Sequence, residues 1–224
     1  IQGVYKVTVG GSVKSADSYS VNTDAGVVTI SEAPAQGVDN VQIWWIGPGS
    51  DRIDITGMRH AELFNGANDS RVFIYGDGSN RVLYSGLDED GKPSAEYFPE
   101  QAEIEVGEAN TPVTSLIRHY DRLLAFKPGS AYSIYYGGLS LADGSYAPGF
   151  YIKPVNRSFG NEAPGQVCLV ENRPRTLDAR GIYEWRGTSS GNITGDQRNA
   201  QRISQRVQRT LLGFDPEKTV CFYD

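Results

Sequence analysis

The chain has 224 residues, of which 39% are hydrophobic and 21% charged, with 26 glycines and 11 prolines. This composition is that of a globular, turn-rich protein and excludes a disordered one. The formal net charge of −6 argues against a protein that binds nucleic acid over its whole surface, although a local basic patch stays open. The 13 tyrosines, against a single methionine, fit β-structure.

Cysteine content and apolar runs narrow the class further. Cys168 and Cys221 are the only cysteines, so there is no disulfide framework, and one bridge or two free thiols are the alternatives. Cys168 lies in the apolar run Val167–Val170, which favours a buried, inert thiol. No apolar stretch approaches the length of a membrane span, and no signal peptide is recognised. Position 1 is isoleucine and residues 219–224 have the composition of a strand, so we expect a fragment, a processed product or the ordered part of a longer chain.

Residues 1–56 are predicted to form a small all-β module. Its strands are expected where β-branched and aromatic residues recur between turn residues, at Val4–Val9, Tyr19–Asn22, Val27–Ile30 and Asn40–Ile46. A sheet of this size needs another element to cover its apolar face. The run Gly47–Asp51 is the clearest break in the chain, so the domain boundary is predicted between it and Gly57.

The larger unit, residues 57–224, is also predicted to be rich in strands. Val72 and Ile74, and likewise Val82 and Tyr84, lie two residues apart, the spacing that places side chains on one face of a strand. A hairpin turn is expected at residues 76–80. Further strands are expected at Ala61–Phe64, Thr114–Arg118, Arg122–Phe126, Ala131–Tyr136, Gly149–Val155, Gln166–Glu171 and Gly181–Arg186. Antiparallel meanders that repeat in this way are typical of propeller blades or of sandwich sheets.

The connections and the C-terminal end complete the predicted fold. Gly137–Pro148 is interpreted as an exposed loop, and Asn172–Arg175 as the turn between the last two strands. One amphipathic helix is expected from Asp196 to about Leu212, because Ile203, Val207 and Leu211 recur every four residues. The predicted fold class is therefore mainly β, with antiparallel meander sheets resembling propeller blades, a small N-terminal β-module and one C-terminal amphipathic helix.

Arginines recur along the polar side of the predicted helix, at Arg198, Arg202, Arg206 and Arg209. Three interpretations are open: a solvated helix face, a basic surface that contacts DNA, and a surface that meets an acidic neighbouring subunit. The helix has no aromatic stacking partners for bases, so a protein interface is favoured over DNA contact.

Two adjacent tryptophans, Trp44 and Trp45, are the other interface candidates. Successive side chains of a strand point to opposite faces, so one indole is expected in the core and the other at the surface or in an interface. A platform that stacks on a glycan is the alternative interpretation.

No arrangement of residues predicts an active site, a metal site or a cofactor site. Asp88–Gly91 resembles part of a calcium loop but lacks its spaced oxygen ligands, so an acidic hairpin tip is favoured. Glu103 and Glu105 share one strand face, as in a pair of glycosidase carboxylates, yet outward charges on strands are common. The two histidines, His60 and His119, have no ordered cluster of further metal ligands.

Several segments stand in a characteristic order along most of the chain: Phe64–Phe73, Arg81–Leu87, Glu96–Pro99, Tyr120–Lys127, Asn199–Val207 and, in the first module, Tyr19–Ile30 with Ala33–Gly37. In this order and spacing they resemble a family of tailed-bacteriophage virion proteins. These are β-propeller tail or head–tail connector proteins, related to the nozzle and stabilisation proteins of short-tailed phages. Each segment is moderately specific, and the order carries more weight than any one of them.

The resemblance implies a non-enzymatic structural subunit of a ring around the tail axis. It implies a place in the virion tail or neck, synthesis in the host cytoplasm, and other virion proteins and copies of the chain as partners, with DNA close by. Trp44 or Trp45 would be a hydrophobic anchor, and Arg202, Arg206 and Arg209 would form intersubunit ion pairs. A propeller needs at least about four blades, and about three are expected after residue 57, with Thr219–Tyr223 beginning another.

Two other functions stay open at this point. A carbohydrate-binding or glycan-hydrolysing tail-associated β-protein would hold its site at the loop-rich ends of its sheets. A fragment of a bacterial surface repeat is the third interpretation, which the missing signal peptide weakens.

Overall fold

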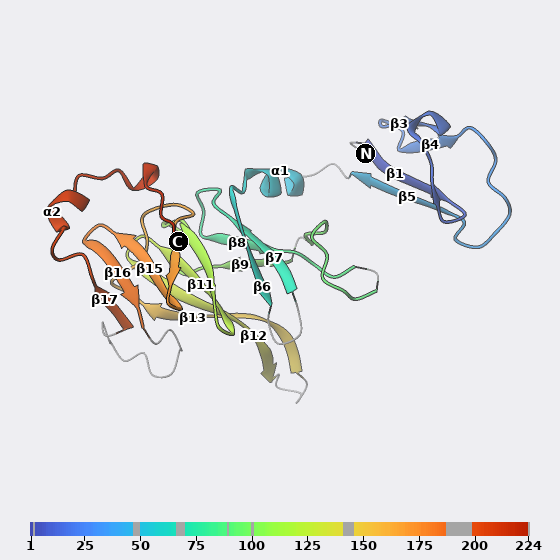
Figure 1. Cartoon of the computed structure of the whole chain (residues 1–224). Coiled ribbons are helices and arrows are strands. Elements are labelled where there is room, and N and C mark those ends of the chain that lie inside the picture. The colour runs from blue at the N-terminus through green and yellow to red at the C-terminus, as the bar shows by residue number, and fades with distance from the viewer. Residues whose placement is uncertain are drawn as a thin grey trace. The chain divides into compact units, whose positions relative to one another are not determined.

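The computed structural model describes residues 1, 3–46, 50–65, 70–88, 90–99, 101–140, 146–186 and 199–223. These residues form antiparallel β-sheets and two short α-helices, so the predicted mainly-β class is confirmed (Figure 1). None of the sheets within the described ranges closes into a ring. The chain divides into two compact units, Ile1–Ile53 and Asp54–Asp224.

The first unit holds the four predicted strands, β1 (Gly3–Val9), β3 (Tyr19–Asn22), β4 (Val27–Ile30) and β5 (Val41–Ile46). It also has a short strand that was not predicted, β2 (Ser12–Val13). One sheet has the order β2-β1-β5, and β3 and β4 form a separate hairpin. Val7 is fully buried, whereas Tyr5, Val13 and Trp45 are each more than half exposed, so this small sheet encloses little core.

The division between the units falls inside α1 (Ser50–Gly57), close to the predicted boundary before Gly57. The break residues Gly47–Gly49 lie outside the described residues. That each unit is a separate domain stays a prediction.

The second unit contains three four-stranded antiparallel sheets that follow one another along the chain (Figure 1). The first sheet consists of β6 (His60–Asn65), β7 (Ser70–Tyr75), β8 (Arg81–Tyr84) and β9 (Glu103–Glu105). The second consists of β10 (Ser115–His119), β11 (Arg122–Lys127), β12 (Ser130–Ser140) and β13 (Tyr146–Asn156). The third consists of β14 (Cys168–Val170), β15 (Arg173–Asp178), β16 (Gly181–Trp185) and β17 (Ala200–Arg202). In each of these three sheets, strands that are neighbours in sequence pair with each other.

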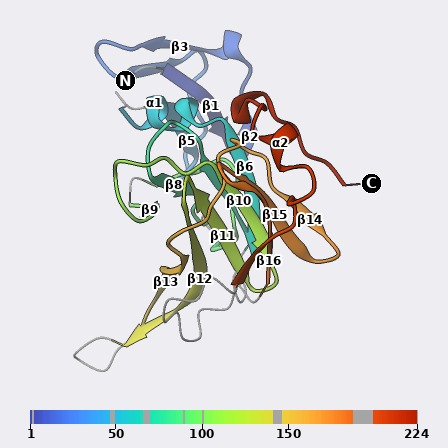
Figure 2. The same cartoon turned by 90° about the vertical axis from the view of Figure 1, so that its left-hand side faces the viewer.

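β10 of the second sheet lies beside β6 of the first and β15 of the third (Figure 2). The three sheets share two hydrophobic cores. Phe73 of the first sheet packs in one cluster with Leu123 of the second, and Phe126 of the second packs in another cluster with Trp185 of the third. Successive residues of β11 alternate between the two clusters, as side chains of a strand must. The second sheet is therefore covered on both faces by apolar side chains.

Asn161 ties the connection between β13 and β14 to both neighbouring sheets. Its fully buried amide nitrogen donates to Ser115 Oγ at 2.7 Å, and its carbonyl oxygen accepts the backbone N–H of Leu177 at 3.0 Å. Buried amides that satisfy both their donor and acceptor groups fix one packing arrangement, because any shift would leave a buried polar group unpaired.

Two predicted irregular connections are wrong. Gly137–Pro148 was expected to be a loop, but β12 and β13 extend into it and pair as far as Ser140↔Tyr146; residues 141–145 lie outside the described residues. Asn172–Arg175 was expected to be a turn, but β15 begins at Arg173 and lies between β14 and β16. Pro174 misleads here, because proline normally argues against a central strand.

The predicted helix from Asp196 to about Leu212 is also wrong over most of its described length. Ala200–Arg202 is strand β17, which pairs with β16, and only α2 (Gln208–Leu211) is helical. Ala200 is buried beside Trp185, and the buried hydroxyl of Ser204 accepts the N–H of Ile182 at 3.0 Å. Pairing with a sheet edge thus outweighs the helical periodicity. Residues 196–198 lie outside the described residues.

The described residues 219–223 are not a strand either, so the predicted beginning of a further blade is wrong. Neither helix in the described part of the chain has the length and hydropathy that crossing a membrane requires.

Candidate interaction face of the third sheet

The third sheet has one face in the shared core and one face turned away from it. Thr176, Tyr183 and Trp185 point inward. The opposite side chains make up what we call the outer face: Cys168, Val170, Arg173, Arg175, Leu177, Ile182 and Glu184. Cross-strand pairs such as Cys168↔Arg175, Arg175↔Glu184 and Leu177↔Ile182 place these side chains together.

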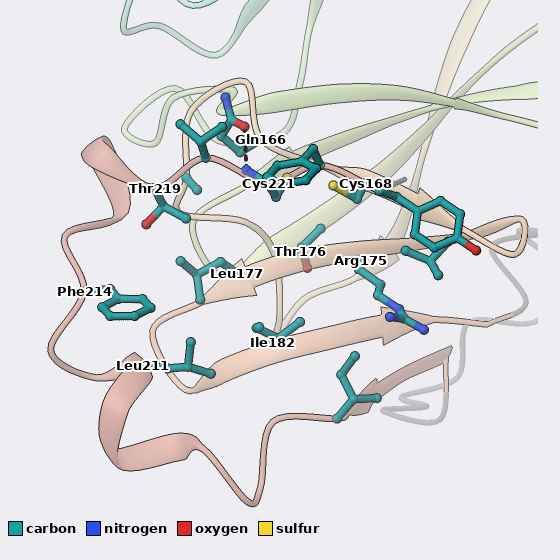
Figure 3. Close-up of a pocket in the computed structure, with 16 residues that line it drawn as sticks. Gln166, Cys168, Arg175, Thr176, Leu177, Ile182, Leu211, Phe214, Thr219 and Cys221 are labelled. Carbon is teal, nitrogen blue, oxygen red and sulfur yellow. Dashed lines mark hydrogen bonds between the residues drawn. The ribbon is translucent and has the colours of Figure 1, made fainter.

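One half of the outer face is apolar and hollowed. A cavity of about 380 Å³ lies there, between Leu177 and Ile182 of the sheet and Leu211 and Phe214 of the following segment (Figure 3). Within the described part of the second unit, no fourth sheet packs on this half as the second sheet packs on the inner face. Its cover is instead the irregular C-terminal segment, which we define as residues 208–223.

The C-terminal segment is held to the sheet by a few polar contacts. The side-chain amide of Gln208 donates to the carbonyl oxygen of Arg180 at 2.7 Å, and the backbone N–H of Cys221 donates to Gln166 Oε1 at 3.1 Å. Its large apolar side chains remain mostly in solvent: Leu212, Phe214, Val220, Phe222 and Tyr223 are each more than half exposed. A contiguous apolar surface of this kind indicates an interaction site.

The other half of the outer face is charged. The carboxylate of Glu184, only 6% exposed, accepts hydrogen bonds from Arg173 and Arg175 at 3.1 Å each and from Arg186 at 3.0 Å. Three guanidinium groups around one carboxylate leave an excess of positive charge. Arg173 and Arg186 are about half exposed, so this charge is available to a partner. The Nε of Arg175 is buried and has no acceptor among the described residues.

Burial alone would raise the pKa of Glu184, but the hydrogen bonds from Arg186, Arg175 and Arg173 outweigh it and hold the pKa below the ordinary value of 4.5. Because the folded-state pKa is lowered, this carboxylate stabilises the fold above pH 4.5, and the stabilisation is lost as pH falls through the folded-state pKa.

We therefore predict that Glu184→Gln lowers the free energy of unfolding at pH 7 by about 2 kcal/mol and that the difference from the parent protein shrinks in acid. Urea unfolding measured from pH 7 down to about pH 3 tests this. Glu105→Gln, at an exposed position of β9, is the matched control and should follow the parent curve. A difference that stays constant with pH would contradict the ionic role of Glu184.

The predicted interface arginines do not form one row. Arg202 lies on the edge strand β17, Arg206 in the turn after it and Arg209 in α2; all three are exposed. Arg198 lies outside the described residues. The prediction that these arginines share one helix face is therefore wrong, while their role in an interface stays a prediction.

Trp44 and Trp45 belong to β5 of the first unit. Trp44 is half-buried with the Lys6 ammonium 4.3 Å from its ring centroid, and Trp45 is 54% exposed. The ammonium over the indole face is a cation–π contact. The outer face of the third sheet and this tryptophan pair are thus separate candidates, in different units.

The remaining polar candidates have local structural partners. Glu103 accepts a hydrogen bond from Arg81 at 3.5 Å, and His119 Nε2 contacts the carbonyl oxygen of Asn172 at 2.8 Å. The rings of His60 and Tyr75 pack in a tilted arrangement with 5.2 Å between their centroids. Burial, followed by the charge of Arg59, lowers the pKa of His60. The described residues contain no group of three or more His, Cys, Asp or Glu side chains placed to hold a metal ion.

The acidic turn at Asp88 is closed by hydrogen bonds between the Asp88 side chain and backbone N–H groups that follow it. Asp88 Oδ1 accepts the N–H groups of Asp90 at 3.0 Å and Lys92 at 2.7 Å, which is the hydrogen bonding of an Asx turn. These residues therefore form a turn in the connection between β8 and β9, and their being a hairpin tip stays a prediction; Glu89 lies outside the described residues.

Sequence reasoning missed two features of the outer face. The alternation of Arg173 with Arg175 and of Glu184 with Arg186 is a signal for cross-strand ion pairs, but the turn predicted at 172–175 hid it. Cys168 was expected to be buried and inert, but it is only half-buried and lines the same cavity as Cys221.

The sequence matches no protein-family model, and no curated protein is similar to it.

Proposed function

We propose that this chain is a non-enzymatic structural protein of a bacteriophage virion, a subunit of the tail or of the head–tail connector. The sequence resemblance to β-propeller virion proteins supports a place in the tail or head–tail connector. The arrangement of the sheets in the second unit supports a structural role. Three consecutive four-stranded meanders that pack face to face are what successive propeller blades would be.

The observation that carries the proposal is the outer face of the third sheet. A stack of sheets in which the inner faces share apolar cores ends here on a face that is partly apolar, partly cationic and only loosely covered. Such a face is suited to pack against another part of an assembly, because association would remove apolar surface from water and pair the surplus arginine charge.

Charge distribution along the chain favours another copy of the chain as the partner. Residues 173–209 contain eight arginines and three acidic residues, while residues 88–108 contain eight acidic residues and one lysine. A positive surface on one copy and a negative surface on the next give a head-to-tail interface, which closes into a ring when the rotation between copies permits it.

We therefore predict that the triple variant Arg202→Glu, Arg206→Glu, Arg209→Glu weakens self-association by at least about tenfold. Sedimentation velocity over a concentration series at low and high salt measures this, and raising the salt should weaken association of the parent protein. Arg157→Glu, an exposed arginine outside the third sheet, is the control and should leave association unchanged. A parent protein that stays monomeric at all concentrations would contradict the copy-to-copy interface.

The virion role has its own test. Antibody raised against the chain and detected with gold should label the neck or the tail of purified phage particles by electron microscopy. Particles that remain bare, while the lysate of infected cells reacts with the antibody, would remove the structural role. Substituting Trp45 and the three arginines should then reduce incorporation into particles in those phages where label is found.

A carbohydrate-handling β-protein stays the alternative proposal. It requires carboxylates free to act on a sugar, and Glu103 is engaged with Arg81 while Glu105 is exposed on the same strand. Binding to an oligosaccharide that is lost on Glu105→Gln would favour this alternative.

A further inference from the structure

The two cysteines of the chain meet at the apolar half of the outer face. Cys168 begins β14 and Cys221 belongs to the C-terminal segment, 53 positions later. Both are free and both line the same cavity (Figure 3), and the Cys168 thiol contributes to the raised pKa of Cys221.

The surrounding structure holds the pair in place. Cys168 is paired with Arg175 in the register of β14 and β15, which fixes its backbone. The backbone N–H of Cys221 donates to Gln166 Oε1, two residues before Cys168, so the final stretch of chain is anchored beside the same strand. Two thiols that line one cavity, on backbones fixed by independent bonds, need little rearrangement to be joined.

We propose that Cys168 and Cys221 are a disulfide site, which closes when the folded protein meets a low-molecular-weight disulfide such as oxidised glutathione. One cysteine thiolate attacks the glutathione disulfide, forms a mixed disulfide and releases one glutathione thiolate. The second cysteine thiolate then attacks the protein sulfur of the mixed disulfide and releases the second glutathione. The two cysteines lose two electrons, the glutathione disulfide gains them, and the protons of the two thiols pass to the released glutathione or to solvent.

The environment makes this site slow at neutral pH. Burial, with the neighbouring Cys168 thiol as the next cause, raises the pKa of Cys221 to about 12. Although the residue as a whole is exposed, it lines the cavity together with Cys168. Since the thiolate is the reacting form, closure should accelerate as pH rises through the range above 8.

Closure would fix the C-terminal segment over the apolar half of the outer face. The bond joins two points far apart in the chain, and cross-links that close long loops restrict the unfolded state most. We expect the oxidised protein to melt about 5–10 °C higher than the reduced protein. This site does not depend on the proposed virion role, because its evidence is the place of both cysteines at one cavity and the anchoring of Cys221 to Gln166.

Incubation of the folded chain with oxidised glutathione at pH 8.5 tests the proposal. The expected result is a loss of both free thiols, a monomer on a non-reducing gel, and a proteolytic peptide pair joined between Cys168 and Cys221 by mass spectrometry. Dithiothreitol should restore the thiols and the lower melting temperature.

The position of the thiol has its own control. The double variant Cys221→Ser, Phe222→Cys moves the thiol one residue along and should close at least about tenfold more slowly. The single variants Cys168→Ser and Cys221→Ser should each retain one thiol, or carry one glutathione, without the cross-linked peptide. Two stable glutathione adducts, a disulfide between two molecules, or unchanged thiols in the folded parent would each overturn the proposal.

Discussion

Gly160→Ala is expected to destabilise the second unit more than any other single change considered. A Cβ at this position would overlap the carbonyl oxygen of Lys127 and would lie 2.6 Å from the carbonyl oxygen and 2.7 Å from the nitrogen of Ser130. These are backbone atoms of the turn between β11 and β12, so they cannot move aside as the end of a flexible side chain can. The connection after β13 packs directly on this turn.

The same close approach is used by two hydrogen bonds. Gly160 donates its N–H to Asp178 Oδ2 at 3.1 Å, and Asn161 donates its N–H to Lys127 O at 3.1 Å. Moving the backbone outward to make room for a methyl group would break both bonds in a buried place. We expect a loss of at least about 4 kcal/mol in the free energy of unfolding, or no soluble folded protein.

Gly149→Ala provides the matched comparison. Its added Cβ would meet only the hydroxyl of Tyr151, at 3.9 Å, which is ordinary contact. Urea unfolding, with circular dichroism as the signal, should place this variant within about 1 kcal/mol of the parent. Equal stability of the two alanine variants would mean that the connection does not sit against the β11–β12 turn.

The strands were predictable where local pattern and partner coincide. The hairpin of Tyr19–Asn22 with Val27–Ile30 was confirmed to the residue, because alternation and a turn between them specify both strands. Most of the strand residues in the first two four-stranded sheets were predicted for the same reason. The helix predicted around Ala200 was wrong because a distant partner decides the structure there. The segment has helical spacing, yet its position beside Trp185 makes it a strand.

The candidate site was harder to predict than the fold, because its features join residues that no local pattern connects. The carboxylate of Glu184 is surrounded only because Arg173, Arg175 and Arg186 come together through the register of two strands. Cys168 and Cys221 line one cavity only because of the path that the C-terminal segment takes. In the sequence, Gly160 looks like an ordinary loop glycine, because Lys127, whose carbonyl oxygen leaves no room for a Cβ, is far away in sequence. Composition and periodicity predict none of these three features.

Trp185→Ala is expected to detach the third sheet from the second. The indole is fully buried, lies 5.1 Å from the ring centroid of Phe126, and donates its Nε1–H to Thr176 Oγ1 at 2.8 Å. Truncation leaves a large cavity in the core that these two sheets share and leaves the buried Thr176 hydroxyl without its donor. The expected cost is about 3–5 kcal/mol.

The loss should be local, and hydrogen exchange shows where it falls. Amides of β15 and β16 should exchange much faster in Trp185→Ala, while those of β7 and β8, whose side chains pack in the other cluster, should change little. Trp185→Phe keeps the ring contact and should cost less than half as much. Trp45→Ala, at an exposed position of the first unit, should leave exchange in all three sheets unaltered. Equal acceleration in every sheet would mean that the second unit unfolds as one body and that the two cores are not separable.

This variant also separates structure from association. If the outer face joins copies of the chain, Trp185→Ala should lose self-association together with the order of the third sheet. The arginine variant should lose association while exchange in β15 and β16 stays as in the parent. Association that survives the loss of the third sheet would place the interface elsewhere, with the exposed Trp45 of the first unit as the next residue to replace.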